Sequence, residues 1–304
     1  MAGPDTPAGA ADSSPDRIAV LNEDRASGVA SKPYDLATVD HDYPARDGPP
    51  ARTVLLCTHP RSGSTLLGEA LYFAGGLGCP LEYFHAGFRP SFANRWGAPD
   101  LEQLGAKVCR HRTEPNGTMS VKLFWRDIEE IAREADPGLV DFADVPPGDA
   151  PADYYRALAS HMGRLFPNPT VVHLRRDDRL RQAISAVVAV DTGRWRSIRG
   201  IDGQSSLGAP VFDTERIERI MSYSDYCHGH LHNLFGAMGV TPLPLSYEAL
   251  TTDYSTSVGR VLAYLGSDAE VPAPRMQRQA DADSEAMVLR YLRDRAAAGG
   301  GPDR

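Results

Sequence analysis

Cysteine and long apolar runs are both scarce in this sequence. The 304 residues hold four widely spaced cysteines, and these match neither a zinc-binding pattern nor a disulfide framework: Cys57, Cys79, Cys109 and Cys227. No stretch approaches the roughly 20 apolar residues of a membrane span. The first residues, MAGPDTPAGAADSSPD, lack the basic segment and apolar core of a secretory signal. We therefore predict a cytoplasmic protein without a membrane span.

Positive charge is in the minority. There are 32 Lys and Arg against 40 Asp and Glu, a formal net charge of −8 at pH 7. A net negative surface would repel nucleic acid, so nucleic acid is not expected as the main partner, although a local basic pocket for a small anion stays open. The length suits one large α/β domain or two small ones.

Residues 1 to about 50 have few apolar side chains and are rich in Pro, Ala, Gly, Asp and Ser. Such a segment buries too little surface to offset the entropy lost on ordering. We predict a largely disordered tail over residues 1–50, with local docking left open, and one folded domain over residues 51–304.

The stretch around which the chain is organised is Val54–Leu67, VLLCTHPRSGSTLL. Four apolar residues lead into a turn rich in Pro, Ser and Gly. The apolar residues that follow recur at helical spacing until Gly75: Leu66, Leu67, Ala70, Leu71 and Ala74. A strand, tight loop and helix in this order aim backbone N–H groups and the positive end of a helix dipole at one point. The pattern predicts an anion-binding loop.

The loop lacks the lysine of nucleoside-triphosphate-binding loops. If GxxxxGK[ST] is laid on Thr58–Thr65, its first Gly falls on Thr58 and its Lys on Ser64. No later strand carries a convincing Asp for magnesium, and the cation stands inside the loop, at Arg61. A small-molecule kinase would share the strand, loop and helix but should have the lysine that Ser64 replaces. It is kept as an alternative, together with a catalytically silent nucleotide-binding protein.

PRSGST at residues 60–65 resembles the 5'-phosphosulfate loop of sulfotransferases that use 3'-phosphoadenosine 5'-phosphosulfate (PAPS). The resemblance implies that the donor is bound by Arg61, Ser62, Gly63, Ser64 and Thr65. It also implies that Arg61 is catalytic, because it would stabilise charge on the leaving phosphate oxygen. The transferred group carries a single negative charge, so we expect no metal.

CPLEYFH at residues 79–85 follows the first predicted helix. PRSGSTLL followed by P-x-E-[YF]-F resembles the bacterial trehalose 2-sulfotransferase family, where the Glu of this segment is the proposed catalytic base. The resemblance thus implies that Glu82 is the general base. A carboxylate among apolar neighbours tends to have a raised pKa, which suits that role, and a solvated loop glutamate is the alternative.

Two further residues are candidates for binding the acceptor. SVKLFW at residues 120–125 is similar to a GxKLxW strand of the family, so Lys122 is expected to point toward the site. Trp195 lies in an arginine-rich segment that would act as a lid. The alternatives are a strand-edge charge for Lys122 and a plain surface loop around Trp195.

A second buried strand, Thr170–Leu174, ends at two arginines. Sulfotransferases hold the 3'-phosphate of the donor with an Arg after a strand and a Ser in the next helix. The separation of Arg176 and Ser185 matches the family's HxxRPDxxxQAxS, and an Arg can bind phosphate through two parallel hydrogen bonds. The family's Pro is Asp177 here, so the choice between Arg175 and Arg176 stays open.

Two C-terminal segments extend the resemblance. PLPLSYEAL resembles a YE-x-L element that sulfotransferases often carry here, which implies that Tyr247 approaches the nucleotide. RQADADSE resembles the family's RQ-A-x-x-x-S-[DE], which implies that Arg278 and Gln279 close over the cofactor; a solvated helix end is the alternative. HGHLH at residues 228–232 suggests a metal motif, but residues two apart on a helix point about 200° apart, so we expect no metal there.

Strand, loop and helix units recur at Val54, Val121, Val171 and Leu243. They predict an α/β fold with a central parallel sheet flanked by helices, as in P-loop kinases and sulfotransferases. Residues 89–115 are interpreted as a substrate-side insertion. The resemblance, over roughly residues 52–290, implies sulfuryl transfer from PAPS to a hydroxyl of a trehalose-like sugar or a secondary metabolite. The oligomeric state stays open, with a homodimer among the options.

Overall fold

The computed structural model describes residues 35–142, 144–195, 208–276 and 282–299. At its centre is a four-stranded sheet of order β2-β1-β3-β4, in which every neighbouring pair is parallel. The strands are β1 (Arg52–Thr58), β2 (Thr118–Phe124), β3 (Pro169–Arg175) and β4 (Leu243–Ser246). The predicted α/β class and all four predicted strands are confirmed.

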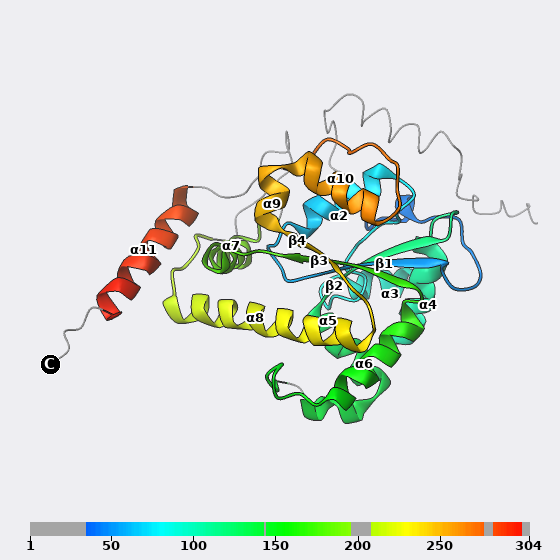
Figure 1. Ribbon diagram of the computed structural model, residues 1–304, viewed down its shortest axis with the longest axis horizontal. Coiled ribbons are helices and arrows are strands. Elements are labelled where there is room, and N and C mark those ends of the chain that lie inside the picture. The colour runs from blue at the N-terminus through cyan, green and yellow to red at the C-terminus, as the bar shows by residue number, and fades with distance from the viewer. Residues whose placement is uncertain (1–34, 143, 196–207, 277–281, 300–304) are drawn as a thin grey trace, which may run out of the picture.

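Helices cover both faces of the sheet (Figure 1). One face carries α2 (Ser64–Ala74), α9 (Tyr247–Thr252) and α10 (Tyr254–Tyr264). The other carries α4 (Leu101–Arg112), α5 (Trp125–Ala135), α6 (Ala152–Leu165) and α8 (Thr214–Ala237). The remaining elements are η1 (Val39–His41), α3 (Arg89–Trp96), η2 (Pro137–Phe142), α7 (Arg179–Thr192) and α11 (Ala282–Gly299).

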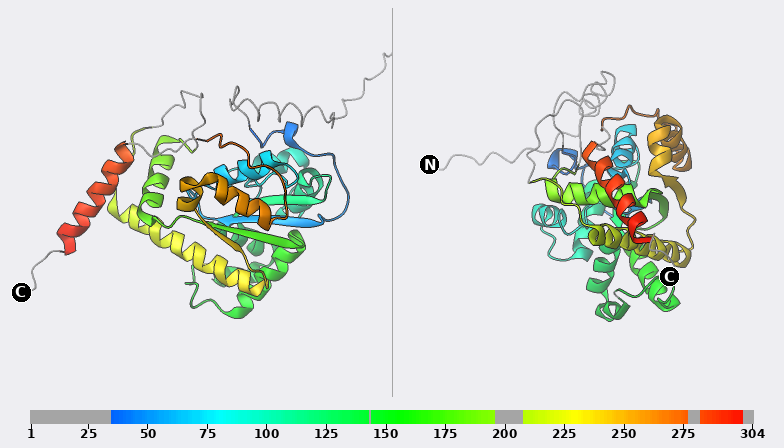
Figure 2. Two further views of the ribbon diagram at one scale, coloured as in Figure 1. Left: turned by 45° about the horizontal axis from the view of Figure 1, so that its top comes forward. Right: turned by 90° about the vertical axis from the view of Figure 1, so that its left-hand side faces the viewer.

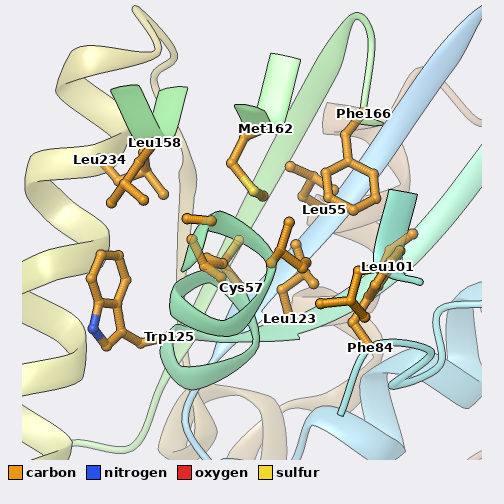
Figure 3. Close-up of a cluster of buried hydrophobic side chains, with 14 of the residues drawn as sticks. Leu55, Cys57, Phe84, Leu101, Leu123, Trp125, Leu158, Met162, Phe166 and Leu234 are labelled. Atoms are coloured by element: carbon orange, nitrogen blue, oxygen red, sulfur yellow. The ribbon is translucent and has the colours of Figure 1, made fainter. Parts of the chain in front are cut away.

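The sheet separates two hydrophobic cores because successive side chains of a strand point to opposite faces. Val54 and Leu56 of β1 pack with α2 and α10, whereas Leu55 and Cys57 join the larger core with α4, α5, α6 and α8. Figure 3 shows part of this larger core, including Leu55, Cys57 and Trp125. Strands buried on both faces read as continuous apolar runs, as in other parallel sheets.

Residues 89–115, interpreted from the sequence as a substrate-side insertion, contain the whole of α3 and α4. Phe92, Trp96, Leu104 and Val108 are buried members of the larger core. This stretch therefore supplies side chains to the larger core, and its place on the substrate side stays a prediction. Phe92 and Trp96 are four residues apart, as are Leu104 and Val108. This spacing in the sequence indicates helices with an apolar face that packs on the core.

Residues 35–50, which the sequence assigns to the tail, include a segment held against α4. The fully buried guanidinium of Arg112 donates to the carbonyls of Leu36 and Thr38 at 2.9 and 3.1 Å, and it lies 2.9 Å from Asp42. This part of the chain therefore docks on the domain. Residues 1–34 lie outside the described residues, and their disorder stays a prediction.

Helix α11 lies beside α7, away from the sheet (Figures 1 and 2). Met287, Val288 and Tyr291 of α11 pack in a small cluster with α7 and α8, and Glu285 pairs with Arg181 at 2.8 Å. Within the part of the chain that the structure describes, no helix is long and apolar enough to cross a membrane.

Candidate active site

The chain makes a tight turn between β1 and α2, at the carboxyl edge of the sheet. Arg61 and Gly63 have φ values of 66° and 80°, in the left-handed region that favours glycine. Such a backbone costs a residue other than glycine about 1–3 kcal/mol, so the surrounding contacts must hold Arg61 in it. A Cβ on Gly63 would lie 2.8 Å from Cδ2 of Tyr247. The loop therefore needs glycine at position 63 for two separate reasons.

Gln182 of α7 holds the loop in place. Its amide nitrogen donates to the carbonyl of Pro60 and to the hydroxyl of Ser62, both at 2.9 Å, and its amide oxygen accepts from Ser224 at 3.1 Å. Gln182 is 1% exposed, so these contacts are shielded from water. Gln182 is not among the site residues predicted from the sequence, although it stands within the QAxS spacing.

Arg61, Arg176 and Ser185 meet on the side of the loop that faces α7. Nε of Arg61 donates to the Ser185 hydroxyl at 3.0 Å, and Nη1 of Arg176 donates to the Arg61 carbonyl at 3.3 Å. Burial, and then the charge of Arg176, lower the pKa of Arg61 to about 10. Arg61 stays charged at neutral pH, beside a second cation. An anion placed here would relieve their repulsion.

Arg175 is the last residue of β3, and Arg176 follows it in the connection to α7. Arg175 is exposed and lies 3.4 Å from Asp177, whereas Arg176 is 7% exposed and lies over the Tyr247 ring at 4.4 Å. Arg176 is thus the arginine that lies beside the loop. Glu248 accepts a hydrogen bond from the Asp177 amide at 3.0 Å, so α9 also supports the start of α7. Glu248 was not recognised from the sequence.

Glu82 and Lys122 form an ion pair near the N-terminus of α2. The Lys122 ammonium donates to Glu82 Oε1 at 2.8 Å and to the Thr65 hydroxyl at 3.4 Å, and the Lys122 side chain is 4% exposed. Val121 and Leu123 enter the larger core, so Lys122 between them points to the α2 face. Glu82 therefore faces a cation, in contrast to the apolar surroundings expected from the sequence.

The remaining sequence candidates are only partly described. Trp195 is exposed, and its carbonyl accepts from Nη1 of Arg61 at 2.7 Å. Its role as an acceptor lid stays a prediction, because residues 196–207 are outside the described ranges. Arg278 and Gln279 also lie outside the described residues.

Three histidines lie close together between the sheet and α8. Nε2 of His173 and Nδ1 of His228 share a hydrogen bond of 2.9 Å, and the ring of His59 lies 6.2 Å from that of His228. Burial is the main cause that lowers the pKa of His59 and His173 to about 4 and that of His228 to about 2. All three are therefore neutral at pH 7.

The histidines of HGHLH do not converge on one point. His228 bonds to His173, whereas His230 stacks on Trp125 with a ring distance of 4.5 Å, and His232 is exposed. Among the described residues, no group of three or more His, Cys, Asp or Glu side chains could hold a metal ion.

Comparison with known proteins identifies the family. The sequence profile of the Stf0 sulphotransferase family matches residues 53–294. Two relatives named trehalose 2-sulfotransferase, from Mycobacterium tuberculosis and Mycolicibacterium smegmatis, are each 28% identical to this chain. The matches cover 79% and 82% of this chain and 94% and 96% of the relatives. A solved sulfotransferase from Alicyclobacillus acidocaldarius has a TM-score of 0.39 at 15% identity, covering 80% of this chain and 93% of that one. Because the profile spans most of the chain and includes the loop, Glu82 and Arg176, this protein belongs to the Stf0 sulphotransferase family.

Proposed function

We propose that this enzyme transfers the sulfuryl group of PAPS to a hydroxyl of a sugar resembling trehalose, or of a secondary metabolite. Family membership supports sulfate transfer, and both named relatives are trehalose 2-sulfotransferases. The observation that carries the proposal is the distribution of charge around one loop. Arg61 and Arg176 lie on its α7 side, and the Glu82–Lys122 pair lies at the start of α2.

The residues beside the loop fit the two anionic ends of PAPS. Backbone amides at the start of a helix suit the 5'-phosphosulfate, which assigns Ser62, Gly63, Ser64 and Thr65 to that end. The guanidinium of Arg176 and the hydroxyl of Ser185 suit the 3'-phosphate, with Arg61 between the two ends. Tyr247 would border the nucleotide, because its ring already lies against Arg176. Arg278 and Gln279 are proposed to close over the donor.

We assign Glu82 the role of general base. Its carboxylate would take the proton of the acceptor hydroxyl while the acceptor oxygen forms a bond to sulfur. The bond from sulfur to the 5'-phosphate oxygen breaks, and the electron pair stays on that oxygen. Arg61 and the loop would stabilise the resulting charge. Trp195 is proposed to contact the acceptor.

The donor is tested by comparing 3'-phosphoadenosine 5'-phosphate (PAP) with ADP. We expect PAP to raise the melting temperature and ADP to raise it far less, because ADP lacks the 3'-phosphate. Mass action predicts stabilisation of about 2.7 kcal/mol at a hundredfold excess of ligand over the dissociation constant. Equal shifts with PAP and ADP would remove the role assigned to Arg176 and Ser185.

The acceptor is tested by incubation with PAPS and a panel of sugars and metabolites, beginning with trehalose. Mass spectrometry should show one product with an added sulfate. A catalytically silent protein would bind PAP and modify no compound of the panel. Turnover with ATP and magnesium would favour the kinase alternative.

A further inference from the structure

Lys122 contacts both the proposed base and the loop end of α2. Its ammonium lies 2.8 Å from Glu82 Oε1 and 3.4 Å from Oγ1 of Thr65, the second residue of α2. The sequence assigned Lys122 to the acceptor. These contacts place it between Glu82, the carboxylate that would receive the proton, and Thr65, one of the residues assigned to the phosphosulfate.

We propose that Lys122 is a catalytic residue that binds an oxygen of the transferring sulfuryl group. This inference rests on the proposed function, in which Thr65 borders the phosphosulfate. Lys122 rather than Arg61 would thus supply the cation at the sulfur end of the donor.

The contacts of Arg61 support this division of roles. Its Nε donates to Ser185 and its Nη1 to the Trp195 carbonyl, so both bonds run toward α7 and the segment after it. Arg61 also lies close enough to Arg176 for that charge to lower its pKa. Arg61 therefore belongs with the groups assigned to the nucleotide phosphates, whereas Lys122 belongs with Thr65 and Glu82.

The charge on Glu82 changes during the proposed step, and this gives Lys122 its function. Before transfer, the Glu82 carboxylate offsets the buried ammonium and is held in place by it. When Glu82 accepts the proton of the acceptor hydroxyl, it becomes neutral. The ammonium then lacks its anionic partner, and the oxygens of the sulfuryl group become the nearest negative charge. Lys122 would therefore already bind the sulfuryl group in the PAPS complex, and it would bind that group most strongly as the acceptor–sulfur bond forms.

The test compares the binding of PAPS and PAP, which differ only by the sulfuryl group. Titration calorimetry would measure both ligands with the wild type, Lys122→Met and Arg61→Gln. Loss of a charged hydrogen bond predicts that Lys122→Met weakens PAPS binding about 10- to 100-fold. PAP binding should stay within about threefold of wild type in that variant. Arg61→Gln is the matched control and should weaken PAPS and PAP by the same factor.

Equal losses of PAPS and PAP affinity in Lys122→Met, or unchanged affinity for both, would overturn the assignment of Lys122. If Lys122→Met does not fold, the double variant Lys122→Met/Glu82→Gln is used, because it removes both charges. Its affinities for PAPS and PAP are then compared with those of the single variant Glu82→Gln. A wild-type protein that binds neither PAP nor PAPS would instead reject the proposed donor. The two proposals therefore fail in distinguishable ways.

Discussion

At the scale of single residues, the position of each charged side chain along the backbone decides whether it lies beside the loop. Arg176 is buried beside the loop, whereas the preceding Arg175 is exposed. Lys122 points toward Glu82 and Thr65 because Val121 and Leu123 on either side enter the larger core. A shift of one residue along the chain therefore separates a charged side chain at the site from one that is exposed or from an apolar side chain in the core.

Substitution of Glu82 separates binding from chemistry. Glu82→Gln keeps the shape of the side chain and removes the proposed base, so PAP affinity should stay near that of wild type. Turnover should fall by about 10²–10⁴. Turnover would be measured with PAPS and the acceptor found by mass spectrometry, and PAP affinity by calorimetry.

Glu218→Gln is a suitable control, because it removes a different ion pair, the one at 3.2 Å between Glu218 of α8 and Arg295 of α11. Near-normal turnover of Glu82→Gln would refute Glu82 as the base and direct attention to His85, His59 or His173. His85 is nearest, since its amide donates to the Glu82 carbonyl at 3.2 Å.

At the scale of elements, the loop is held from two helices. Gln182 of α7 binds the Pro60 carbonyl and the Ser62 hydroxyl, and Tyr247 of α9 lies against Gly63. Tyr247 also lies under Arg176 of the β3–α7 connection. A change in the loop should therefore move the residues proposed to bind the nucleotide.

Alanine at Gly63 tests this coupling. Its Cβ would meet Tyr247 at 2.8 Å in a left-handed backbone of φ 80°. Gly97→Ala is the matched control, because Gly97 has φ 65° and open space around the position of a Cβ. Both variants should lose about 1 kcal/mol of stability from backbone strain. Only Gly63→Ala should also weaken PAP binding, by about tenfold or more, since displacing Tyr247 disturbs Arg176. Thermal unfolding and calorimetry measure the two effects, and equal PAP affinities in the two variants would contradict the coupling.

At the scale of the whole molecule, one histidine cluster joins the loop, the sheet and the longest helix of the described chain. His59 follows β1, His173 lies in β3, and His228 lies in α8, which runs below the sheet in Figure 1. These three elements come from distant parts of the chain. Their contact therefore ties the active-site edge to the packing of α8.

The cluster should make stability depend on pH. Burial lowers the pKa of His59 and His173 to about 4, while an unfolded histidine titrates near 6.5. Below pH 6.5 the unfolded state then binds more protons than the folded state. The free energy of unfolding is therefore highest above that pH and declines as the pH falls toward 4. The decline is at most about 1.4 kcal/mol per pH unit and histidine. Asp127 has the opposite effect. Burial raises its pKa to about 7, so the folded state takes up a proton at Asp127 before the unfolded state does as the pH falls.

Urea unfolding between pH 7.5 and 5 would isolate the contribution of His228. His228→Gln should flatten the loss of stability on acidification, because the pKa of His228 is lowered to about 2 in the folded protein. His232→Gln is the control from the same helix, since His232 is exposed. Identical pH slopes for wild type and both variants would show that the cluster does not govern acid stability.

Local patterns in the sequence determined the elements and the candidate loop. The apolar runs located all four strands, the spacing after Gly63 located α2, and the residues of the loop and of the Glu82 segment indicated the family. These features depend on neighbours in the chain, so periodicity and motif spacing are sufficient to detect them.

Only the tertiary structure decided which residues meet. Lys122 and Glu82 are 40 positions apart, and Gln182 and Ser62 are 120 apart. The structure also placed α3 and α4 in the larger core and docked the segment around Asp42 on Arg112. Such contacts follow from the strand order β2-β1-β3-β4, which brings distant segments together. Strand order results from the packing of whole helices on each face, and no local pattern of residues encodes it.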